Sequence, residues 1–107
     1  MDTTIEAQIV MERCDILGGS SEEPGILTRR YGTPAMRLVN ERVAAWMHDA
    51  GMAVRQDNAG NLVGRYEASS EGARTLLLGS HLDTVRDAGK YDGPGRTDRA
   101  GLRAAPA

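Results

Sequence analysis

The feature that most restricts the fold is a short apolar run, TLLLG at residues 75–79, with polar sequence on both sides. A strand with one face in water alternates apolar and polar residues, whereas a strand covered on both faces is apolar throughout. The run therefore predicts a buried strand in an α/β sheet that has helices on its faces. A polar loop at 68–74 precedes this strand, and His81 and Asp83 follow it.

Two helices are expected before this strand. Residues 3–18 carry an apolar stripe at spacings of three and four, and Gly18 and Gly19 end it. The stripe consists of Ala7, Val10, Cys14 and Leu17. Thr33 is suited to cap a second helix and Pro34 to its first position, while Gly51 can end it in a left-handed conformation. The apolar face of this helix consists of Val39, Val43, Trp46, Met47 and Ala50.

Residues 53–67 predict a β-hairpin. Strands at 53–57 and 61–67 are separated by Asn58-Ala59-Gly60, and Asn and Gly supply the backbone angles that a tight turn requires. Two helices, a hairpin and a buried strand together predict an α/β fold.

The composition excludes several classes of function. Cys14 is the only cysteine in the 107 residues, which rules out an internal disulfide and a cysteine-based zinc site. Its place on the apolar stripe of residues 3–18 predicts that it lies in the core. A net charge of −2 gives no reason to expect a nucleic acid or an anionic membrane as partner. No apolar run approaches the ~20 residues of a membrane span, and the N-terminus lacks the features of a signal peptide, so we expect a cytoplasmic protein.

The polar residues after the apolar run are the candidate functional site. On extended backbone His81 and Asp83 would point to the same side, so that Asp83 orients the imidazole and leaves its second nitrogen for a metal ion. Asp92 ends a glycine-containing loop and can supply an oxygen ligand, while the small residues Gly79 and Ser80 allow close approach. A surface loop with solvated His and Asp side chains is the alternative. His48 is interpreted as a solvated residue at a helix end.

The stretch LLLGSHLDTVRDAGKYDGP, residues 76–94, resembles the metal-binding segment of the dinuclear zinc amidohydrolases that cleave ureido groups, the allantoate amidohydrolase and N-carbamoyl-L-amino-acid hydrolase family. Residues 22–66 also resemble that family. The resemblance implies a metallopeptidase-like catalytic domain with two divalent ions, Zn or Mn. It implies His81 as a metal ligand, Asp83 as the catalytic carboxylate that orients it, and Asp92 as the bridging metal ligand. It further implies a small ureido substrate, with allantoate preferred to N-carbamoyl-L-amino acids, and a homodimer formed through a separate domain.

The resemblance stops after Pro94. Residues 95–107, GRTDRAGLRAAPA, show neither helical nor strand periodicity, so we expect an aberrant, disordered tail and hypothesise a shifted reading frame or an artificial terminus. Residues 1–94 would then be the N-terminal part of the catalytic domain. The paired glutamates and later histidines of the family are absent, so we expect an inactive, marginally stable chain that does not dimerise. The residues that would bind the substrate are unknown. A noncatalytic α/β binding module is the alternative.

Overall fold

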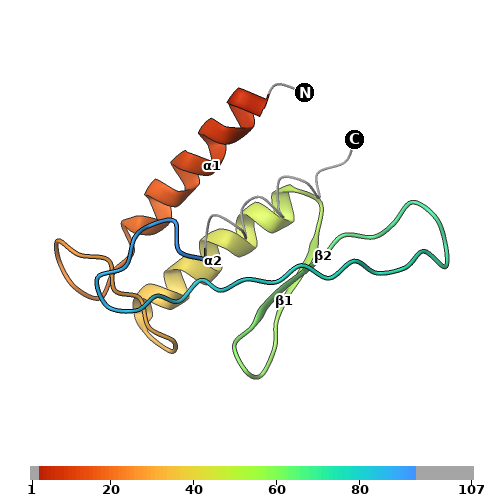
Figure 1. Ribbon diagram of the computed structural model, residues 1–107. Helices are drawn as coiled ribbons and strands as arrows, with labels where there is room; N and C mark the ends of the chain where they lie inside the picture. The colour runs from red at the N-terminus through yellow and green to blue at the C-terminus, as the bar shows by residue number, and fades with distance from the viewer. Residues whose placement is uncertain (1–2, 94–107) are drawn as a thin grey trace.

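Two helices and a two-stranded sheet make up the regular structure of the chain. The computed structural model describes residues 3–93, and its elements run in the order α1 (Thr3–Gly18), α2 (Pro34–Asp49), β1 (Ala53–Gln56) and β2 (Leu62–Arg65) (Figure 1). The prediction of a small fold that combines helices with strands is confirmed at this level. The predicted tail at 95–107 lies outside the described residues.

Helix α2 begins and ends as its sequence predicts. The Thr33 hydroxyl accepts a hydrogen bond from the Met36 backbone N–H at 3.3 Å, and Pro34 occupies the start of the helix. Past the C-terminus, Gly51 has a φ of +92°, the left-handed conformation that glycine adopts without strain. Val39 and Val43 on the predicted apolar face are buried.

Helix α1 is packed only along its C-terminal half. Cys14 and Leu17 are buried and Val10 is half-buried, but Ala7 is exposed, so the predicted stripe holds for only part of the helix. The first turns of α1 extend away from the other described elements (Figure 1). Cys14 lies in the core, as its place on the stripe predicted.

The hairpin forms with shorter strands than the sequence suggested. β1 and β2 pair antiparallel, with Ala53 opposite Arg65. The Asp57 carboxylate closes the turn, because one of its oxygens accepts hydrogen bonds from the Ala59 and Asn61 backbone N–H groups at 3.0 and 2.8 Å. The Asp57 N–H still donates to the Asn61 carbonyl at 3.0 Å, but the Asn61 N–H bonds to the Asp57 side chain, and the strands end beside this pair, β1 before Asp57 and β2 after Asn61.

The predicted buried strand at residues 75–79 is wrong. The structure assigns no strand to this run, and Leu76, Leu77 and Leu78 are 82%, 88% and 61% exposed. Within residues 3–93 the sheet contains only β1 and β2, so the run has neither a neighbouring strand nor a covering layer there. An apolar run becomes a buried strand only where such partners exist. In Figure 1 it is drawn as an extended loop.

A small core joins the helices, the hairpin and the candidate site. Leu17 of α1 and two valines of α2 form its buried centre, and Leu82, which lies between His81 and Asp83, packs against them. The other contributors are Trp46, Met47 and Leu62.

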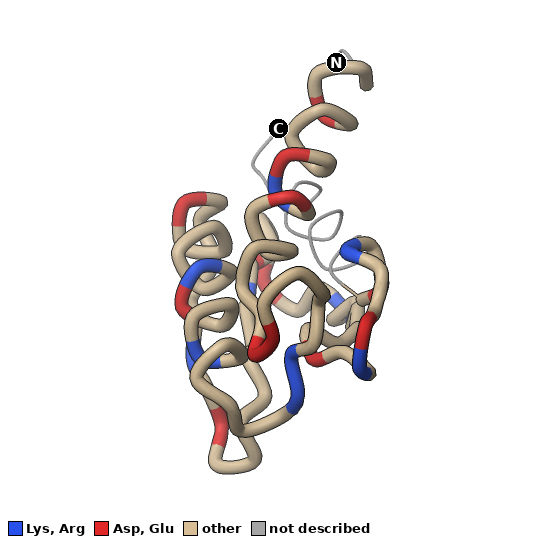
Figure 2. Tube along the Cα trace, turned by 90° about the vertical axis from the view of Figure 1, so that its left-hand side faces the viewer, with Lys and Arg blue, Asp and Glu red and all other residues tan. Residues whose placement is uncertain are grey.

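Among residues 3–93 no helix is long and apolar enough to cross a membrane. Basic and acidic residues alternate over the elements without a large region of one sign (Figure 2).

Candidate metal centre

The segment that carries the candidate ligands is held against the loop between the two helices. The Thr84 backbone N–H donates to the Arg29 carbonyl at 2.7 Å, and the Arg29 N–H donates to the Thr84 hydroxyl at 2.8 Å. The Ala88 N–H donates to the Leu27 carbonyl at 2.8 Å. These bonds are long-range pairs that give residues 81–84 a defined position on the core.

Side chains alternate between core and solvent along this segment. Leu82 packs on the hydrophobic core and Thr84 is buried, whereas the side chains of His81 and Asp83 are 52% and 51% exposed. Residues two apart therefore face the same way, as on any extended backbone. The core contact of Leu82 determines that His81 and Asp83 face outward.

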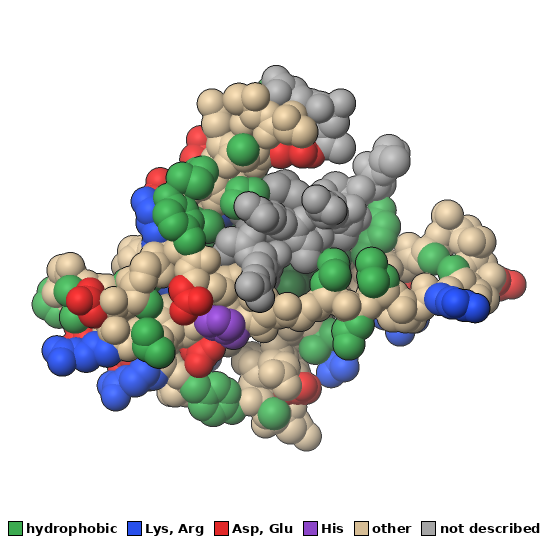
Figure 3. All heavy atoms as spheres, in the orientation of Figure 1, with side chains coloured by type: hydrophobic (Ala, Val, Ile, Leu, Met, Phe, Trp, Pro, Cys, Tyr) green, Lys and Arg blue, Asp and Glu red, His purple; other side chains and the backbone are tan. Residues whose placement is uncertain are grey.

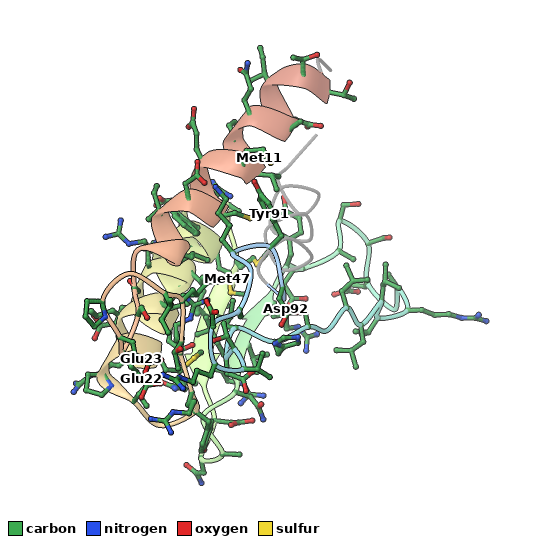
Figure 4. The ribbon with its side chains drawn as sticks, turned by 60° about the vertical axis from the view of Figure 1, so that its left-hand side comes forward. Met11, Glu22, Glu23, Met47, Tyr91 and Asp92 are labelled. Atoms are coloured by element: carbon green, nitrogen blue, oxygen red, sulfur yellow. The ribbon has the colours of Figure 1, made fainter. Side chains whose placement is uncertain are left out.

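A tight turn brings Asp92 to this same place. The Asp92 backbone N–H donates to the Gly89 carbonyl at 3.3 Å, and the Ser80 hydroxyl donates to the Gly93 carbonyl at 3.1 Å. Gly93 has a φ of +76°, and a Cβ atom added to it would lie 2.0 Å from the His81 carbonyl oxygen. Only glycine permits this approach, so Gly93 allows the turn to lie against His81. Figure 4 labels Asp92 on this turn.

The three predicted site residues lie together. His81 Nε2 is 3.6 Å from Asp92 Oδ1, and His81 Nδ1 is 3.4 Å from Asp83 Oδ1. A shorter contact, 2.9 Å, joins His81 Nδ1 to the backbone carbonyl oxygen of Asp83. A carbonyl oxygen only accepts, so this contact is a hydrogen bond when Nδ1 carries a proton, and in a neutral imidazole the lone pair is then on Nε2, the nitrogen nearer Asp92. Figure 3 shows a histidine side chain beside acidic ones on the exposed face.

The role expected of Asp83 is therefore divided between two groups. The sequence suggested that the Asp83 carboxylate would orient the imidazole, and it lies 3.4 Å from His81 Nδ1, whereas the main-chain carbonyl of Asp83 lies closer, at 2.9 Å.

The donor atoms fit part of a divalent metal site. Zinc lies about 2.0–2.1 Å from a histidine nitrogen and about 2.0–2.2 Å from a carboxylate oxygen. Donors 3.6 Å apart can share one ion at an N–metal–O angle of about 120°. Among residues 3–93 no group of three or more His, Cys, Asp or Glu side chains could hold a metal ion. His81 and Asp92 are thus close enough to share an ion, but the described residues bring no third such side chain to them.

Sequence reasoning missed two residues that build this centre. Gly79 was expected to permit close approach, but a Cβ there would meet nothing within 4 Å, whereas one on Gly93 would collide with His81. Arg29, which no sequence pattern marked, is fully buried and donates a hydrogen bond to the Leu82 carbonyl. Burial lowers the pKa of the Arg29 guanidinium, and the nearby Asp83 carboxylate acts in the opposite direction. His48 is exposed at the end of α2, as expected.

Comparison with known proteins gives the chain its relatives. No family model matches the sequence. The chain is 43% identical to allantoate deiminase 1 of Glycine max over 77 residues, which is 72% of this chain and 16% of that protein. It is 40% identical to the N-carbamoyl-L-amino acid amidohydrolase of Geobacillus stearothermophilus over 91 residues, 84% of this chain and 22% of that protein. The allantoate deiminase of Arabidopsis thaliana is 43% identical over 77 residues, 72% of this chain and 15% of that protein.

The chain thus spans less than a quarter of the length of these relatives. The matches nevertheless cover 72–84% of this chain. They include both allantoate deiminases and an N-carbamoyl-L-amino acid amidohydrolase, the two kinds of enzyme that the sequence resembled. The chain is a homologue of the allantoate deiminases and N-carbamoyl-L-amino-acid amidohydrolases.

Proposed function

We propose that this chain provides the first ligands of a divalent metal centre in an amidohydrolase that cleaves ureido C–N bonds. The observation that carries the proposal is the 3.6 Å separation of His81 Nε2 and Asp92 Oδ1. The other imidazole nitrogen, Nδ1, lies within hydrogen-bond distance of the Asp83 carbonyl oxygen. The names of the relatives support the reaction class. A cytoplasmic location is part of the proposal.

Each residue of the centre has a separate task. His81 offers Nε2, and Asp92 offers a carboxylate that can contact one ion or bridge two. Asp83 holds the imidazole in the tautomer that leaves Nε2 free to bind. A bound Zn or Mn ion would polarise the scissile group and lower the pKa of a water molecule. Gly93 keeps Asp92 close to His81, so the donor pair exists before an ion arrives.

Allantoate is the proposed substrate, and N-carbamoyl-L-amino acids are the second candidate. The soybean allantoate deiminase favours the first at 43% identity, while the bacterial carbamoyl amidohydrolase favours the second because its match covers 84% of the chain. Both substrates carry a ureido group. The same metal chemistry would therefore serve either.

We further propose that the chain of 107 residues does not itself turn over either substrate. A catalytic zinc site usually has three protein ligands and an open position, and the described residues bring together two. The control is the same protein without metal. Ammonia released from allantoate above that control, with Zn or Mn supplied, would contradict inactivity and leave the metal assignment standing.

Calorimetric titration with zinc tests the metal centre. His81→Ala removes one donor of the pair, so the affinity should fall by about tenfold or more. His48→Ala is the matched control, since it removes the other histidine of the chain from an exposed helix end. Equal affinity in all three proteins would reject the site. Tight binding at a defined stoichiometry would instead favour a noncatalytic metal-binding module.

A further inference from the structure

Arg29 is the most deeply buried charged residue of the described chain, and the proposed function does not use it. Its side chain is fully buried between α1 and the segment of His81. The Nη1 group donates to the Leu17 carbonyl at 2.7 Å and to the Ser20 carbonyl at 3.2 Å, while Nε donates to the Leu82 carbonyl at 3.0 Å. One guanidinium thus joins the C-terminal end of α1 to the candidate metal centre.

The Leu82 carbonyl occupies a critical point of that centre. It belongs to the residue between His81 and Asp83, so fixing its direction restricts the rotation of the two neighbouring peptide planes. Those planes carry the Asp83 carbonyl, which orients the imidazole, and the His81 carbonyl, against which Gly93 packs. Rotation at Leu82 would therefore disturb both contacts of His81.

A structural role alone does not require an arginine at this position. Burying a guanidinium costs free energy, and lowering its pKa reflects that cost. Nη2 is moreover buried without a hydrogen-bond partner among the described residues. An apolar side chain would pack on the core without these costs, but it has no donor for the carbonyls of Leu17, Ser20 and Leu82, which the guanidinium fork binds together.

We propose that Arg29 is the positioning residue of the metal centre: by holding the Leu82 carbonyl it sets the orientation in which His81 faces Asp92. The inference rests on the proposed metal site for its purpose, although the contact itself is independent of any ion. The Arg29 side chain hydrogen-bonds to the carbonyls of Leu17, Ser20 and Leu82, so it acts on His81 through the backbone that carries it.

Arg29→Lys is the test variant, because it keeps the positive charge but cannot reach Leu17, Ser20 and Leu82 together. Arg30→Lys is the matched control, the same substitution one residue later on an exposed side chain that pairs with Glu22. Zinc affinity should fall by about tenfold for Arg29→Lys, as for the loss of other outer-shell contacts, and stay unchanged for Arg30→Lys. Circular dichroism reports whether each variant is folded.

A spectroscopic readout separates positioning from stability. In metal-free protein at mildly alkaline pH, the nitrogen shifts of His81 should show the Nδ1–H tautomer in the wild type and in Arg30→Lys, and a mixture of tautomers in Arg29→Lys. A folded Arg29→Lys protein with the wild-type tautomer and zinc affinity would overturn the inference. Retained tautomers with no zinc binding in any protein would reject the proposed function instead.

If Arg29→Lys fails to fold, the unaltered chain still decides. Nitrogen-labelled arginine should give one Nε–H signal that exchanges slowly and couples through its hydrogen bond to the carbonyl carbon of Leu82. Rapid exchange of every arginine Nε–H, with no such coupling, would show that Arg29 does not hold this carbonyl and would overturn the inference.

Discussion

At the scale of single residues, the candidate centre depends on main-chain groups as much as on its acidic and imidazole side chains. His81 is oriented by a carbonyl oxygen, and Asp92 reaches it because Gly93 has no side chain. Motif residues such as His81 and Asp92 can be recognised in a sequence because their chemistry is distinctive. The glycine and the arginine that place them have no such signature.

Gly93→Ala should separate backbone strain from close approach. Gly72 is the control, because it has nearly the same φ, +74° against +76°, but an added Cβ would meet nothing within 4 Å. Alanine in the left-handed region costs about 1–2 kcal/mol at either position. Only Gly93→Ala also pushes the turn away from His81, so it should lose about tenfold in zinc affinity while Gly72→Ala keeps it. Urea denaturation and calorimetry measure the two effects, and equal zinc affinities would contradict the assignment.

At the scale of elements, prediction succeeded where the signal is local. The ends of α2 follow from Thr33, Pro34 and Gly51, and the hairpin turn from residues 57–61, because caps and turns are made by residues close in sequence. The run at 75–79 was predicted wrongly because burial of a strand is decided by partners elsewhere in space. The pairing of Leu27 and Arg29 with residues 84–88 was missed for the same reason, since no local pattern marks it.

The two paired segments are also joined by Glu23, which should make the free energy of unfolding depend on pH. The Glu23 carboxylate accepts a hydrogen bond from the Thr28 hydroxyl at 2.6 Å and pairs with Arg86 at 3.2 Å, and both contacts lower its pKa below the usual 4.5. A carboxyl whose pKa is lower in the folded state stabilises it above the unfolded pKa, and this contribution is lost as pH falls through the folded pKa.

Glu23→Gln should therefore lower the unfolding midpoint in urea at neutral pH, and the difference from wild type should vanish well below pH 4.5. Glu71→Gln in the exposed loop removes the same charge where the described chain offers no ion pair, and serves as the control. A difference between Glu23→Gln and wild type that persists unchanged into acid would count against the carboxylate contacts.

At the scale of the whole molecule, three consecutive exposed leucines are the feature that most favours self-association. Leu76, Leu77 and Leu78 lie on extended backbone without a strand beside them among residues 3–93. Such a segment offers apolar side chains and backbone groups to another chain, which is the usual origin of edge-to-edge association.

Leu77→Lys should therefore reduce self-association measured by sedimentation velocity across a range of concentrations. The control is Leu38→Lys, which places the same charge on an exposed leucine of helix α2, at 58% exposure against 88% for Leu77. A helix satisfies its own backbone groups, so this second variant should associate like the wild type. Equal improvement in both variants would mean that added charge, rather than the extended run, controls association.

Leu82 places its side chain in the core and its carbonyl on the buried guanidinium. At the proposed metal site, binding of an ion to the folded chain would consequently stabilise the fold, and a more stable fold would bind the ion more tightly by the same free energy. If the proposed site binds an ion, core substitutions at Val39 or Val43, against which Leu82 packs, will then alter the affinity for that ion.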